Sequence, residues 1–361
     1  YLTAPNITEL YPFARDAEGN DNLLIGIAAS HLFELEGPTV SKYTATVTGW
    51  KLQEAIGEVK LTPEMMEMAI PLTSLGDLVA GDDIRVVVVV QPVDQVLPLT
   101  GPAQIVLPDL GLSTLLFEVV DPTGDDHGPG SYTYPTDTVF SAGNFDITNF
   151  NVSVDTSNLI FKFTFLGEIP NAWGAGNNLS LQSMDVYIDK DPGKGTGNRL
   201  LLPGRNAALE KENGWEFAVW AEGWTPGVYA PDPDSGEPEK MNLDYKIIVD
   251  PAAKTVTLRV PLTAFGPGDP STWGYAAVVG SQDGFPSTGV WRWRDAQAAS
   301  AQWKIGGAPD DSNHTRIIDL VWAAEGSPSQ EEMLGTYPAS SATLDTLTAD
   351  DFPLIKLLNV K

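Results

Sequence analysis

Short stretches of alternating apolar and polar residues recur along the whole chain of 361 residues and limit its fold most strongly. They are bounded by Gly, Pro, Asn and Asp, and the 34 Gly and 28 Pro make turns frequent and sharp. Alternation with period two is typical of half-buried strands, whereas long helical periodicity is nearly absent. Short helices are expected only at Asn206–Lys211 and Ala296–Trp303. The pattern predicts an all-β chain of antiparallel β-sandwiches, immunoglobulin-like or jelly-roll-like.

One unit occurs twice. MAIPLTSLGD (Met68–Asp77) and LRVPLTAFGP (Leu258–Pro267) share the order apolar-x-apolar-Pro-Leu-Thr-x-apolar-Gly, and a strand-like run follows each. Matched landmarks in the same order indicate a tandem duplication. We therefore predict two domains, 1–112 and 113–361. The second copy follows LLFEVVDPTGDDHGPGSYTYP, which has no counterpart before the first copy, so the first sandwich is expected to lack its opening strand.

The charge and composition exclude several classes of function. The 48 Asp and Glu against 21 Lys and Arg give a net charge of −27, which repels nucleic acid and anionic membrane surfaces. The chain has no Cys, so disulfides and thiolate chemistry are excluded. Apolar runs are strand-length, and no membrane insertion is expected. Four Asn-x-Ser/Thr sequons are compatible with an exported glycoprotein, at Asn6, Asn151, Asn178 and Asn313.

Two acidic loops are candidate calcium sites. Asp121, Asp125 and Asp126 lie within a span of six residues, in a loop that also contains Gly. Such a loop can turn several oxygens toward one point. Calcium requires six to eight hard oxygen ligands in a flexible cage. Asp189 and Asp191 share one strand face before a second Gly-rich loop and form the other candidate. The alternative for both loops is that each Asp caps its own turn.

Tryptophan is concentrated in the second copy, which holds nine of the ten. Exposed, rigid aromatic faces bind the apolar faces of sugar rings, although the same side chains can fill a core. In GVWRWRDA, alternation places Trp291 and Trp293 on one strand face, and Trp220 opposes the parity of its apolar neighbours. Trp173 and Trp224 lie in Gly-rich loops and are the better candidates. The predicted carbohydrate-binding residues are Trp173, Trp220, Trp224, Trp291 and Trp293.

No catalytic constellation is convincing. The three His residues do not form a paired metal-ligand motif, and no nucleophile elbow, phosphate loop or dinucleotide fingerprint occurs. Carboxylate pairs are too common in so acidic a chain to identify a glycosidase dyad. We therefore expect a protein that is not an enzyme.

The second copy resembles the C-terminal region of glucodextranases and of archaeal amylopullulanases, a DOMON-like β-sandwich. The segments that carry the resemblance include FEVVDPTGDDHGPGSYTYPTDTVF, VYIDKDPGKGTGNRLLLPGRNA, GWEFAVWAEGW and DFPLIKLL, within Leu116–Leu358. The first copy resembles the same sandwich more loosely. The resemblance implies a non-catalytic, extracellular or cell-surface module that accompanies α-glucan degradation. Related domains bind sugars and some bind haem, but this chain offers no persuasive haem ligand.

Two functions therefore remain open. The first is a calcium-stabilised module that binds an α-glucan or a cell-surface polysaccharide. The second is a structural subunit of an archaeal surface layer or filament. In that alternative, copies of the chain would polymerise by donating a strand to the incomplete first sandwich, whose unpaired edge needs a cover.

Overall fold

The computed structural model divides into two compact units, Tyr1–Leu112 and Ser113–Lys361. The second unit is described almost throughout, and the first in segments. The described residues are 1–3, 10–15, 21–36, 39–46, 48–55, 58–61, 66–69, 75, 83–90, 95–97, 103–106 and 113–359.

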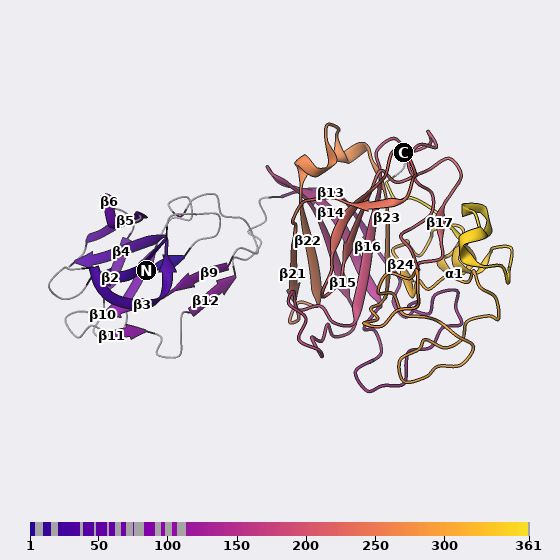
Figure 1. The fold of residues 1–361 in the computed structure, drawn as a ribbon, viewed down its shortest axis with the longest axis horizontal. Helices are drawn as coiled ribbons and strands as arrows, with labels where there is room; N and C mark the ends of the chain where they lie inside the picture. Colours follow the sequence, from indigo (N-terminus) through magenta and orange to yellow (C-terminus); the bar gives the residue numbers. More distant parts are fainter. Residues whose placement is uncertain are drawn as a thin grey trace. The chain divides into compact units, whose positions relative to one another are not determined.

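The first unit is built around an antiparallel sheet in the order β12-β9-β1-β4-β5-β6 (Figure 1). Its strands are β12 (Ala103–Val106), β9 (Asp83–Val86), β1 (Leu2–Thr3), β4 (His31–Glu36), β5 (Thr39–Thr46) and β6 (Gly49–Ala55). The two-stranded sheets pair β2 (Tyr11–Arg15) with β3 (Asp21–Ala29), β7 (Glu58–Leu61) with β8 (Met66–Ala69), and β10 (Val88–Val90) with β11 (Gln95–Leu97). A small core of Ala14, Ala29 and Val87 packs against Trp50, whose indole donates to the Phe13 carbonyl at 2.8 Å.

The valine run of this unit differs from its sequence pattern. Residues 86–90 are apolar on both faces, which predicts one central strand buried on both sides. In the structure the run breaks at Val87, so that β9 and β10 pair in different sheets. Val87 is buried, but Val88 is 41% exposed. The prediction of one doubly buried strand is therefore wrong.

His31 gives the first unit a predictable response to acid. The side chain is buried in β4, and burial, with a smaller contribution from the Lys42 charge, lowers its pKa from 6.5 to about 4. The folded state thus favours the neutral imidazole, so its contribution is present above pH 6.5 and is lost as pH falls toward 4. We expect the free energy of opening of β4 to fall by up to about 3 kcal/mol over that range.

Hydrogen exchange of peptides that cover β4, corrected for intrinsic rates and compared between pH 7 and pH 4.5, measures this loss. The His31→Gln variant should remove most of the difference. An equal pH dependence in both proteins would contradict the assignment.

The second unit is an antiparallel β-sandwich, and it confirms the predicted all-β fold class. One sheet has the order β13-β14-β15-β22-β21 and the other the order β20-β19-β18-β16-β23-β24 (Figure 1). The first sheet contains β13 (Thr114–Val120), β14 (Ile147–Val154), β15 (Asn158–Phe165), β22 (Thr255–Pro261) and β21 (Lys246–Asp250). The second contains β20 (Pro238–Lys240), β19 (Gly227–Pro231), β18 (Phe217–Ala221), β16 (Gln182–Asp189), β23 (Gly274–Ser281) and β24 (Asp319–Leu320).

Between the sheets lies an aromatic core that includes Phe150, Phe161, Phe163 and Tyr275. In the five-stranded sheet, β15 points Leu159, Phe161, Phe163 and Phe165 into this core, as alternation predicts, whereas β22 is buried at six successive residues. Every residue of β16 and β23 is buried, because both faces of these two strands are covered.

A layer of long connections covers the outer face of the six-stranded sheet. It contributes a second apolar cluster, in which Trp215, Val290, Ile317, Leu334 and Ile355 pack on strand residues. The layer includes α1 (Gln330–Gly335) and the parallel pair β17 (Ala208–Leu209) and β25 (Leu354–Ile355) (Figure 1). Short 3₁₀ turns lie at Leu262–Phe265, Pro270–Thr272, Leu344–Thr346 and Ala349–Asp351. Neither expected helix forms: 206–211 contains β17, and 296–303 is irregular.

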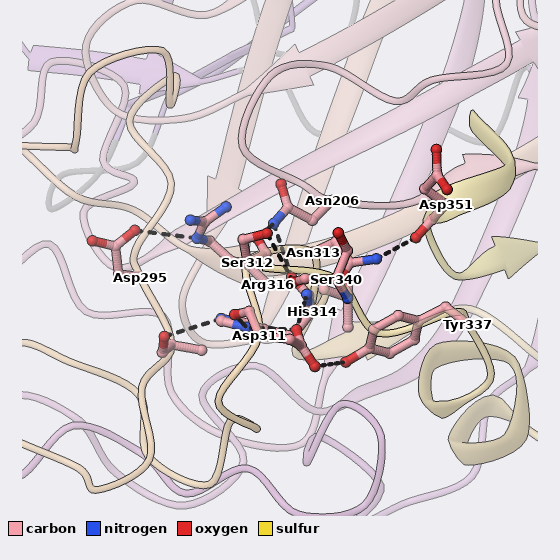
Figure 2. A network of polar contacts seen from close by, with 12 residues as sticks. Asn206, Asp295, Asp311, Ser312, Asn313, His314, Arg316, Tyr337, Ser340 and Asp351 are labelled. Carbon is pink, nitrogen blue, oxygen red and sulfur yellow. Dashed lines mark hydrogen bonds and ion pairs between the residues drawn. The ribbon is translucent and has the colours of Figure 1, made fainter. Parts of the chain in front are cut away.

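Side-chain hydrogen bonds hold this layer together, as Figure 2 shows. Asn313 donates to the carbonyls of Pro338 and Asp351 and accepts from the Ser340 amide. Asp311 accepts from the Tyr337 hydroxyl at 3.0 Å and from the His314 amide at 2.8 Å. Long irregular segments are stable here because their polar groups find partners within the layer. Among the described residues, no helix is long and apolar enough to cross a membrane.

Candidate functional site

A groove lined by aromatic side chains is the main candidate site. Its volume is about 750 Å³, and loops that follow β15, β18 and β23 form its walls. Trp173, Trp224 and Trp303 remain about 40% exposed on it, and Phe285 is 95% exposed. The lining residues are Trp173, Trp224, Gln282, Asp283, Gly284, Phe285, Arg292, Arg294, Trp303 and Lys304. Large aromatic side chains are mostly buried in folded proteins. Several of them exposed in one depression therefore indicate a binding surface.

The loop of Trp224 is fixed by a buried carboxylate. Glu222 is fully buried at the end of β18, and its carboxylate accepts the Trp224 amide at 2.9 Å. The other oxygen of Glu222 pairs with Arg292 at 3.2 Å. The Arg292 guanidinium in turn lies 5.0 Å from the centre of the Trp224 ring, within range of a cation–π contact. The indole is thus held in place before any ligand arrives.

Trp173 and Trp303 approach each other across the groove. Their ring centres are 6.0 Å apart at 62°, an edge-to-face contact. Asn171 accepts the Ala175 amide at 2.7 Å and closes the loop of Trp173, whose own amide donates to Ser180 at 3.2 Å. The carbonyl of Trp303 accepts from the buried Arg294 at 2.8 Å. Each aromatic residue is therefore fixed by hydrogen bonds to its own backbone or that of its loop.

Polar groups accompany the aromatic faces. The buried Gln282 lines the groove, and its amide nitrogen has no hydrogen-bond partner among the described residues. Asp283 accepts the Phe285 amide at 2.8 Å. An apolar surface with a few fixed polar groups is the usual composition of a small-molecule or sugar site.

Three of the five predicted tryptophans do not lie on the groove. Trp220 and Trp293 are buried, and the Arg205 guanidinium lies 4.9 and 4.2 Å from their ring centres. Trp291 is half-buried and packs against Tyr229, next to a separate hollow. The sugar-facing prediction does not fit Trp220 and Trp293, because both are buried in the apolar cluster between the six-stranded sheet and the connections that cover it.

The predicted alternation through residues 291–294 also fails, because this segment is not a strand. Arg292 has a φ of 45°, in the left-handed region, which interrupts the alternation. Of the predicted residues, Trp173 and Trp224 do line the groove. Sequence reasoning missed Trp303 and Phe285. Phe285 stands in QDGFPS, where an aromatic residue between turn formers is a usable signal.

A second feature is a buried cluster of aspartates at one edge of the sandwich. Asp121 follows β13, Asp125 lies in the loop after it, and Asp319 lies in β24. One carboxylate oxygen of each lies within 4.8 Å of the others. Asp126 is outside this set, since its carboxylate accepts from Tyr134 and faces His127 at 3.8 Å. Sequence analysis missed Asp319 because it is almost 200 residues away in the chain.

The third acidic group combines Asp189 and Asp191 with Glu216, which the sequence analysis did not name. Both oxygens of Asp189 accept backbone amides, from Asp191 at 3.0 Å and Gly214 at 3.1 Å. Glu216 accepts the Lys190 amide at 2.8 Å. These contacts fit the turn-capping alternative, and calcium at Asp189 and Asp191 stays a prediction.

The four sequons differ in accessibility. Asn178 is exposed, and Asn151 is half-buried in β14. Asn313 is fully buried and its amide is bound on both sides, so the folded chain does not present it for glycosylation. Asn6 lies outside the described residues.

A groove of exposed aromatic side chains on a β-sandwich is the kind of surface that ligand-binding modules use. Residues 116–349, or 234 of the 361, match the family described as the C-terminal binding module, SLH-like, of glucodextranase. The chain belongs to this family, which confirms the glucodextranase part of the predicted resemblance. The family is a binding module and not a catalytic domain. The likeness to DOMON-like domains and archaeal amylopullulanases stays a prediction. Among curated proteins, none matches the chain.

Proposed function

We propose that the chain is a non-catalytic accessory module that binds polysaccharide in the groove of Trp173, Trp224 and Trp303. The observation that carries this proposal is the presence of three partly exposed, fixed indole rings in one depression of about 750 Å³. Indole faces stack on the apolar faces of sugar rings, and the neighbouring amide and carboxylate groups match sugar hydroxyls. Membership in a family of glucodextranase binding modules supports this assignment.

An α-glucan fits the groove better than an acidic cell-surface polysaccharide. Three cationic residues line it, but each is already engaged. Arg292 pairs with Glu222 at 3.2 Å, Lys304 with Asp295 at 2.9 Å, and Arg294 donates to Ser281 at 2.9 Å. With the overall charge of −27, little attraction is left for an anionic ligand. A neutral glucan needs no electrostatic attraction to bind.

The proposed location is the cell surface or the exterior of the cell, which the SLH-like family description supports. The alternative of a strand-donated filament has no support in the family match or in the part of the chain that the structure describes. We therefore do not retain it.

Affinity electrophoresis of the full chain in gels with dextran, soluble starch or an acidic cell-wall polysaccharide tests the proposal. We expect retardation by an α-glucan that is nearly unchanged between 50 and 500 mM salt. Trp224→Ala should weaken binding about tenfold, or ~1.4 kcal/mol. Leu166→Ala, which removes an exposed apolar side chain outside the groove, is the matched control.

Retardation only by the acidic polysaccharide, and its loss in salt, would overturn the α-glucan assignment. Equal binding by Trp224→Ala and Leu166→Ala would overturn the assignment of the groove as the binding site.

A further inference from the structure

The aspartate cluster beside β13 and β24 contains more buried carboxylate than its hydrogen bonds satisfy. Asp121, Asp146 and Asp319 are each at most 3% exposed. One oxygen each of Asp121, Asp125 and Asp146 is buried and has no hydrogen-bond partner among the described residues. Leaving a buried carboxylate oxygen unpaired is costly, and several such oxygens at one point are more so. The arrangement therefore calls for a positive partner.

No basic side chain in the described residues supplies that partner. None of the four carboxylates forms an ion pair with Lys or Arg there, and His127 pairs with Asp126 instead. The carboxylates of Asp121, Asp125 and Asp319 instead lie close to one another, each with an oxygen within 4.8 Å of the others, so their negative charges repel. Mutual repulsion is what a bound cation would relieve.

The remaining carboxylate oxygens are held rigidly. Asp121 accepts the Trp322 amide at 2.6 Å, Asp146 accepts the Gly124 amide at 2.7 Å, and Asp319 accepts the Ile147 amide at 2.7 Å. In Asp121 and Asp146, one oxygen is thus anchored to backbone while the other is unpartnered. Anchored ligands that keep one oxygen available are typical of metal sites, where outer contacts orient the ligands.

We propose that Asp121, Asp125 and Asp319, whose carboxylate oxygens lie within 4.8 Å of one another, bind one calcium ion that joins the two sheets of the sandwich, with the Asp146 carboxylate beside this group. Their donors are all hard oxygens, and carboxylates with backbone carbonyls and water complete the coordination that calcium prefers. β13 is an edge strand of one sheet and β24 an edge strand of the other. The ion would therefore link an edge strand of one sheet to an edge strand of the other. This site is separate from the groove and does not depend on its function.

The test is thermal unfolding of the full chain after dialysis against chelator, with 1 mM CaCl₂ or 1 mM MgCl₂ restored. A ligand at 100 times its Kd stabilises the folded state, and for a unit of this size we expect calcium to raise Tm by about 5 to 10 °C. Magnesium should do less, because it demands a tighter octahedral site. Metal analysis after dialysis without chelator should find about one calcium per chain.

Asp121→Asn makes the test specific. The amide oxygen can still accept from Trp322, but one charge is removed, so without calcium this variant should unfold at or above the Tm of the original chain. Calcium should then raise its Tm by less than about 2 °C. Asp234→Asn, an exposed aspartate in a distant turn, should keep the full calcium response.

An unchanged Tm on calcium addition, with no calcium found by metal analysis, would overturn the site. So would a full calcium response in Asp121→Asn, or a response to magnesium but not to calcium.

Discussion

Replacing Arg205 by alanine should lower the free energy of unfolding of the second unit by about 3 to 5 kcal/mol. Arg205 is fully buried, and its guanidinium donates to both oxygens of Asp185, at 2.7 and 2.9 Å. It also donates to the carbonyls of Pro203 and Trp291 and lies over the rings of Trp220 and Trp293. Removing it leaves the buried Asp185 carboxylate without its cation, which is the costly way to break such a pair.

Thermal unfolding measures this effect as a fall in Tm of about 10 °C or more. Arg199→Ala is the matched control, since the ion pair of Arg199 with Asp350 has a largely exposed partner and should contribute less than about 1 kcal/mol. Equal Tm values for the two variants would show that the Arg205 contacts do not hold the outer layer on the sheet.

The second large effect is expected from the two indoles that face each other in the groove. Trp173→Ala and Trp303→Ala should each weaken α-glucan binding about tenfold, or ~1.4 kcal/mol, and the double variant by clearly less than the roughly hundredfold that independent effects would give. Each side chain is about 39% exposed, so its loss leaves most of the core intact.

A double-mutant cycle on dextran affinity checks this prediction, with Tm as the control for folding. Because the two rings are in contact at 6.0 Å, we expect the effects to be measurably non-additive. A change of affinity below twofold in both single variants would exclude their stacking on the sugar.

Period-two patterning was sufficient to predict the fold class, because a strand with one buried face carries that pattern in its own residues. The pattern also places β15, whose Leu159, Phe161, Phe163 and Phe165 face the core. It could not predict the outer layer, in which Leu202, Val290, Leu334 and Ile355 help to cover a sheet face that the pattern treats as exposed. Trp220 and Trp293 were misassigned for that reason.

The candidate site residues were likewise predictable only where the signal is local. Trp173 and Trp224 were found because each lies in a loop rich in turn residues, a local signal. Trp303 was missed, because its segment was expected to be a short helix. Asp146 and Asp319 join Asp121 only through the pairing of distant strands. Nothing in the local sequence at position 319 marks that residue as part of the acidic loop.

The most direct measurement is a calorimetric titration of the full chain with dextran, repeated with the Trp224→Ala, Trp303→Ala double variant. We expect saturable binding by the original chain. The double variant should give no detectable heat, and its Tm should stay within about 2 °C of that of the original chain. Binding of equal affinity by both proteins would contradict the claim that this aromatic groove is the glucan site.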